Sequence, residues 1–224
     1  LASEARTKGP IIDLATGNAA PIVTFLKFLE KKKKTSGADS AIPNLSVIAT
    51  DLYPHLEAWE NIKRKYPFFS FREQPFDAIR QKEDIPCVYT MFSAFHHFNE
   101  DQALELIVSK VSDTSDLMIF EMTPRDDWAN YIWLPFSMPF FMLSSLFARQ
   151  LKFSKIFISL IIPIVPVMVI FDGLMSNLRT YTRSELEALA DQASQASGKN
   201  IKAEYIVKRY SVIMHSYSCR FFIQ

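Results

Sequence analysis

The chain has 224 residues, 49% hydrophobic and 22% charged, which excludes general disorder and fits one ordinary domain. Its 25 basic and 24 acidic residues leave a net charge of +1, so no overall attraction to nucleic acid is expected. The two cysteines, Cys87 and Cys219, are too few for a disulfide framework or a cysteine-based zinc site, which indicates a reducing, cytoplasmic setting.

Short apolar runs alternate with helical patterns in the first half of the chain. Residues 10–15 form the first predicted strand, which ends at the turn signal Thr16-Gly17-Asn18. Further strands are predicted at residues 45–50, 68–71, 87–92 and 116–121, with helices at residues 19–34, 54–66 and 101–111. Asn99 is placed to cap the last of these helices. Strands separated by helices need crossover connections, so the pattern predicts a parallel sheet with helices on both faces.

The residues that follow these strands are candidates for a ligand site, because ligands bind outside the carboxyl ends of such strands. The small-residue turn at 13–19 would let a ligand approach the backbone, and Asp51 is placed to accept hydrogen bonds from a ribose. The separation of Gly17 and Asp51 exceeds the roughly twenty residues of a dinucleotide fingerprint. By itself the turn indicates either a nucleotide-type site or an ordinary strand-to-helix connection.

The run of residues 11–19 resembles the first motif of class I S-adenosylmethionine-dependent methyltransferases. That family favours an acid followed by alternating glycines; here Ala15 and Ala19 stand at two of the glycine positions and Gly17 at the third. The similarity continues through residues 47–51, 76–78 and 91–98, in the order and spacing of the family. Together these motifs span residues 10–121.

This resemblance implies a Rossmann-like, mostly parallel seven-stranded α/β sheet, S-adenosylmethionine as cofactor and methyl transfer by direct displacement. Two closing strands are expected at residues 203–207 and 211–222, one of them antiparallel. The cofactor-binding residues that it implies are Asp13, Ala15, Gly17, Asn18, Asp51, Leu52, Asp77, Ala78, Met91 and Phe92. No group of residues has the spacing of metal ligands.

His96, His97 and Glu121 are the candidates for a general base, which is needed only if the acceptor arrives protonated. Two structural alternatives stay open for these residues. The histidines could be a helix-entry pair bonded to loop backbone, and Glu121 could form an ion pair with Arg125.

The second half of the chain contains two apolar runs, at residues 131–147 and 156–171, joined by a segment with Arg149, Lys152 and Lys155. Each run is too short to span a bilayer and contains two prolines. An insertion at about 128–175, after the fifth strand, would therefore be either a helical cap over the substrate pocket or a membrane-surface contact through residues 131–171. Both interpretations predict a small apolar or lipid-like acceptor. Asp172 and Arg179 are expected to pair and fasten this insertion, or else to touch the acceptor.

The leading hypothesis is a single methyltransferase domain over residues 1–224, with a small-molecule or lipid-like substrate and no nucleic-acid partner. A second hypothesis is a non-catalytic binding or scaffold protein with the same fold. A third is an NAD-linked or nucleotide-sugar enzyme on a similar sheet. Neither the acceptor atom nor the oligomeric state follows from the sequence.

Overall fold

The computed structural model describes residues 9–35, 46–122, 124–144, 157, 164–209 and 215–224. The chain forms two compact units. The first, here called the sheet unit, comprises residues 1–121, 183–206 and 218–224. The second, the helical unit, comprises residues 122–182 and 207–217 and includes the insertion predicted at 128–175. Arg149, Lys152 and Lys155 lie outside the described residues.

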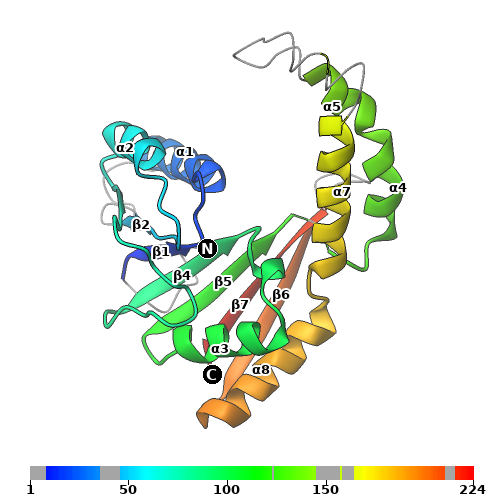
Figure 1. The fold of residues 1–224 in the computed structure, drawn as a ribbon. Helices are drawn as coiled ribbons and strands as arrows, with labels where there is room; N and C mark the ends of the chain where they lie inside the picture. The colour runs from blue at the N-terminus through cyan, green and yellow to red at the C-terminus, as the bar shows by residue number, and fades with distance from the viewer. Residues whose placement is uncertain (1–8, 36–45, 123, 145–156, 158–163, 210–214) are drawn as a thin grey trace. The chain divides into compact units, whose positions relative to one another are not determined.

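Seven strands form one sheet in the order β3-β2-β1-β4-β5-β7-β6 (Figure 1). β1 pairs in parallel with both β2 and β4, β2 with β3, and β4 with β5. The strands are β1 (Ile11–Leu14), β2 (Val47–Ala49), β3 (Phe69–Phe71), β4 (Cys87–Phe92), β5 (Ser115–Glu121), β6 (Ile201–Arg209) and β7 (His215–Ile223). The predicted Rossmann-like, mostly parallel sheet of seven strands is confirmed.

Helices cover both faces of this sheet. α1 (Ala20–Thr35) and α2 (Leu56–Lys65) lie on one face, and α3 (Glu100–Lys110) and α8 (Arg183–Ser197) on the other (Figure 1). Side chains alternate along each strand, so Ile11 packs into the core beneath α1 and α2 while Ile12 points to the opposite face. Asn99 caps α3 as predicted, in a reciprocal capping box with Gln102.

The helical unit contains α4 (Trp128–Phe136), α5 (Met138–Ser144) and α7 (Ile164–Arg179), which contact one another. Gly173 of α7 lies against Leu134 of α4, where an added Cβ would approach the leucine to 3.3 Å. None of the helices described in the chain is long and apolar enough to cross a membrane. Asp172 and Arg179 are both exposed and form no ion pair within the described residues, so the pairing predicted for them is not formed.

Candidate functional site

The turn after β1 has a glycine-type backbone at three alternate positions. Ala15, Gly17 and Ala19 have φ angles of +52°, +55° and +62°. The left-handed region costs an L-residue with a Cβ about 1–2 kcal/mol, so the two alanines are strained. A Cβ added at Gly17 would meet no atom within 4 Å. The turn therefore leaves open space beside its central peptide.

Hydrogen bonds from two other elements hold this central peptide. The Gly17 N–H donates to Asp51 Oδ2 at 2.7 Å, and the Trp59 indole Nε1–H donates to the Gly17 carbonyl at 2.9 Å. Trp59 is fully buried on α2. The sequence predicts a helix over residues 54–66 but does not predict this polar contact, because nothing in the spacing links residue 59 to residue 17.

Asp13 lies buried at the end of β1, inside a network of threonines. Its Oδ1 accepts a hydrogen bond from Thr90 Oγ1 at 2.7 Å, and its carbonyl accepts bonds from the hydroxyls of Thr16 and Thr50 at 2.9 and 2.8 Å. Burial raises the pKa of Asp13 to about 7, against the lowering effect of the threonine hydroxyls. The Asp13 carboxyl therefore faces the protein interior, and the threonines are further residues that the sequence did not single out.

Asp51 connects the turn to the loop after β3. Its Oδ1 accepts the Tyr53 N–H at 2.8 Å, and its carbonyl accepts the Phe76 N–H at 2.8 Å. Gly17, Asp51 and the residue preceding Asp77 are thus joined by direct hydrogen bonds. Leu52, the next residue, is 48% exposed although it is apolar. The structure brings three of the predicted cofactor segments to one rim of the sheet.

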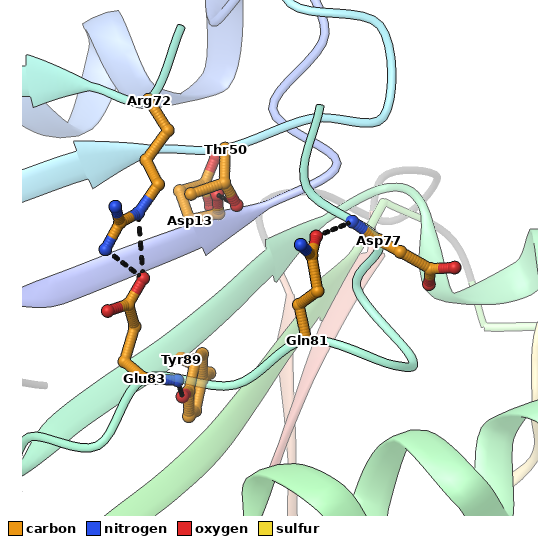
Figure 2. Close-up of polar contacts among 7 residues, drawn as sticks. All are labelled: Asp13, Thr50, Arg72, Asp77, Gln81, Glu83 and Tyr89. Atoms are coloured by element: carbon orange, nitrogen blue, oxygen red, sulfur yellow. Dashed lines mark hydrogen bonds and ion pairs between the residues drawn. The ribbon is translucent and has the colours of Figure 1, made fainter. Parts of the chain in front are cut away.

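The Asp77 carboxylate caps a turn of its own loop. Its Oδ1 accepts the N–H groups of Ile79 and Arg80 at 2.9 and 3.2 Å, while the Asp77 N–H donates to Gln81 Oε1 at 2.6 Å (Figure 2). Ala78 is part of this turn and half-buried. A hollow of about 510 Å³ lies along the same loop, lined by residues 72, 74–76 and 80–84.

The other predicted cofactor residues differ in accessibility. The Asn18 side chain is exposed, and its Oδ1 accepts the Ala20 N–H at the start of α1. Met91 is fully buried, and half-buried Phe92 stacks on Phe120 with ring centroids 4.7 Å apart. Met91 therefore has no exposed surface in this structure, whereas Asn18 does.

Two of the three candidate bases lie together. The backbone N–H of His96 donates to Glu121 Oε1 at 3.2 Å, and His96 Nδ1 lies 3.0 Å from Glu121 Oε2. Both side chains are buried. His97 is exposed, with its ring centroid 4.3 Å from that of His96. With Nδ1 engaged by the carboxylate, Nε2 is the ring atom of His96 that is left for proton transfer.

Comparison with known proteins shows the fold. No protein-family model and no curated protein matches the chain. A solved structure described as a pericyclic reaction enzyme superposes on 98% of this chain and 44% of its own, at 16% identity and a TM-score of 0.54. LepI in complex with S-adenosylmethionine covers the same shares at 14% identity and TM-score 0.54. The mitomycin 7-O-methyltransferase MmcR gives 12% identity and TM-score 0.51 over 95% of this chain and 48% of that one.

The chain therefore has the fold of class I S-adenosylmethionine-dependent methyltransferases, and it spans about half the length of these solved structures. Among the residues that the structure describes, no three His, Cys, Asp or Glu side chains are grouped closely enough to hold a metal ion.

Proposed function

We propose that the protein is an S-adenosylmethionine-dependent methyltransferase acting on a small, apolar or lipid-like molecule. The observation that carries this proposal is the hydrogen-bonded rim formed by Gly17, Asp51 and Phe76, with Asp77 next in the chain. The structural neighbours support the cofactor class, since LepI is bound to S-adenosylmethionine and MmcR is named as an O-methyltransferase.

Asp51 is the residue proposed to hold the cofactor's ribose. Each of its carboxylate oxygens accepts one backbone N–H, which leaves a lone pair on each oxygen for a ribose hydroxyl. The exposed Leu52 side chain offers apolar contact next to it. The open space beside Gly17 would admit the cofactor against the turn backbone. The remaining residues proposed to contact the cofactor are Ala15, Asn18, Asp77, Ala78 and Phe92, whereas Asp13 and Met91, which are buried, are proposed to support the site from the interior.

S-adenosylmethionine, when bound, supplies a methyl carbon activated by the adjacent sulfonium. The protein's part is to hold the acceptor atom in line with that carbon and the sulfur, since positioning supplies much of the rate of such a displacement. We assign His96 Nε2 as the atom that would accept the proton released by the acceptor when it takes up the methyl group. Glu121 would hold the His96 ring through Nδ1 and stabilise its protonated form.

The helical unit supports an apolar acceptor and a peripheral membrane contact. Its exposed side chains include Trp128, Ile132, Phe136, Val167, Met168 and Phe171. Between residues 128 and 171 the sequence has three basic residues and no acidic one. Exposed apolar side chains within a segment of this composition suit an anionic lipid membrane, which would place a cytoplasmic enzyme next to a lipid-like acceptor. A cap over the substrate is the alternative use of the same surface.

Calorimetric titration with S-adenosylmethionine and with its demethylated product tests the cofactor assignment. We expect both to bind and NAD not to compete; competition by NAD would favour the NAD-linked alternative. Transfer of labelled methyl into lipid and small-molecule extracts then tests catalysis. His96→Ala and Glu121→Gln are expected to lower transfer while leaving cofactor affinity unchanged, and His97→Ala tests whether the exposed neighbouring histidine is the base instead.

A non-catalytic protein with the same fold is the second candidate. The two strained alanines at glycine positions of the turn favour this candidate. Cofactor binding with no methyl transfer to any extract would support this candidate. Absence of binding to either cofactor form would overturn the methyltransferase proposal.

A further inference from the structure

Lys110, the last residue of α3, is a buried lysine that the proposed reaction does not use. Its side chain is 1% exposed. The ammonium donates to the Gln81 carbonyl at 2.7 Å, to Ser109 Oγ at 3.0 Å and to the Ile79 carbonyl at 3.4 Å. It lies 5.6 Å from the ring centroid of Tyr89 and forms no ion pair with a described residue. Backbone carbonyls, rather than a carboxylate, therefore surround this buried cation.

The loop that supplies these carbonyls has no helix or strand of its own between residues 72 and 86. It is held to the core by side chains. Lys110 contacts its carbonyls at residues 79 and 81, and Tyr89 Oη of β4 accepts the Glu83 N–H at 2.8 Å (Figure 2). Without Lys110 the two carbonyls would lose the donor that fixes them.

Gln81 connects Lys110 to the rim formed by Gly17, Asp51 and Phe76. Its Oε1 accepts the Asp77 N–H at 2.6 Å, and its own N–H donates to the Asp77 carbonyl at 3.0 Å. Phe76, the neighbour of Asp77, donates to the Asp51 carbonyl at 2.8 Å. Hydrogen bonds from Lys110 to Gln81, from Gln81 to Asp77 and from Phe76 to Asp51, together with the peptide bond between Phe76 and Asp77, thus connect the Lys110 ammonium to the residue proposed to bind ribose.

We infer that Lys110 is a positioning residue, which acts through Gln81 to fix the Phe76–Ala78 edge of the cofactor site. The expected effect of Lys110 on cofactor binding rests on the proposed function. Its effect on the position of the loop depends only on the contacts described above, so that effect can be tested without cofactor.

The protonation state of Lys110 links this edge to pH. The pKa of Lys110 is lowered to about 8, chiefly by burial and also by Lys82, against the raising effect of Asp77, Cys87 and Glu105. Deprotonation removes one N–H donor and the positive charge, so the hold on the carbonyls weakens between about pH 7 and 9. Cofactor affinity is expected to fall over the same range.

Lys110→Met and Lys110→Arg are the variants that test the inference, with exposed Lys202→Met of β6 as the matched control. Lys110→Met should bind the demethylated cofactor about tenfold more weakly at pH 7, as expected for loss of hydrogen bonds to a charged group. Lys110→Arg keeps its charge over this range, so its affinity for the demethylated cofactor should not decline between pH 7 and 9. The same titrations of Lys202→Met record the pH dependence that arises from groups other than Lys110, including Asp13, whose pKa is about 7.

Hydrogen–deuterium exchange of the cofactor-free protein gives the independent readout. Residues 76–83 should exchange faster in Lys110→Met than in the wild type, while residues 20–26 of α1 stay unchanged. If Lys110→Met does not fold, the wild type at pH 7 and 9, corrected for intrinsic exchange rates, gives the same test. Unchanged exchange of residues 76–83 in either comparison overturns the inference. If residues 76–83 do exchange faster in these comparisons but the wild type binds no cofactor, the role of Lys110 in holding the loop is upheld and the proposed function is overturned instead.

Discussion

The sheet unit and the helical unit differ in which side chains they bury and which they expose. At the rim of the sheet, polar groups of Asp13, Gly17 and Asp51 are satisfied by specific hydrogen bonds, of which those to Asp13 are buried. In the helical unit, α7 exposes Val167, Met168 and Phe171 along with other apolar side chains. A buried polar network fixes geometry because each unpaired group is costly, whereas an exposed apolar surface constrains little until something covers it. The two units should therefore respond differently to substitution.

The largest effect is expected at Asp13. Its pKa is about 7 in the fold, compared with an ordinary value of 3.8, so between these pH values the folded protein holds a proton that the unfolded chain releases. The free energy of unfolding should therefore fall as pH rises from about 4 to about 7, by up to about 4 kcal/mol. Asp13→Asn should remove this slope and be more stable than wild type at pH 8.

Urea unfolding between pH 4.5 and 8.5 measures this effect. Asp191→Asn, at an exposed position of α8, is the control and should keep the wild-type slope. Equal stabilities of Asp13→Asn and wild type at pH 8 would contradict the assigned burial of the carboxyl.

Asp51→Ala should give the next largest effect, on binding. It removes the carboxylate that holds the Gly17 N–H and that we propose for the ribose hydroxyls. Two hydrogen bonds to a charged group are worth about 1.5–3 kcal/mol each, so the dissociation constant should rise roughly 100-fold or more. Calorimetry measures the affinity, and near-UV circular dichroism checks the fold. Unchanged affinity in a folded variant would show that this acid is not a ribose ligand.

Glycine at the strained alanines should stabilise the sheet unit modestly. Ala15→Gly and Ala19→Gly relieve about 1–2 kcal/mol of left-handed strain and lose up to about 1 kcal/mol to greater unfolded-state entropy, which leaves a net gain of about 0.5–1 kcal/mol each. Ala188→Gly, at an exposed position within α8, should instead cost about 1 kcal/mol. Thermal unfolding shows whether each glycine substitution raises or lowers the stability. Destabilisation at all three positions would mean that the alanines of the turn are not in the left-handed conformation.

The smallest effect on stability is expected at Phe171 of α7. This side chain is 63% exposed, so Phe171→Asp should change the free energy of unfolding by no more than about 0.5 kcal/mol. If the helical unit contacts membranes, the same change should abolish flotation with anionic liposomes. Ile85→Asp, at an exposed apolar position of the sheet unit, is the control. Failure of the wild type to float would favour the cap.

Local patterns were sufficient to predict much of the sheet unit. Gly17 and Asp51 follow strands whose parallel pairing places their carboxyl ends at one edge, so their proximity follows from strand periodicity and spacing. The contact of Trp59 with Gly17 spans 42 residues, and the hydrogen bond between Thr90 and Asp13 spans 77. No local pattern encodes these separations. The predicted pair of Asp172 and Arg179 was not formed, because two opposite charges on one exposed helix gain little from contact in water.

The sequence alone determined the alternating strands and helices, the glycine-like turn after the first strand and the apolar character of residues 128–171, because each depends on neighbouring residues. The tertiary structure decided which side chains became buried. Burial is what raises the pKa of Asp13, pairs His96 with Glu121 and surrounds the Lys110 ammonium with carbonyls. These properties depend on the desolvation of groups distant in the chain, which only the folded packing creates.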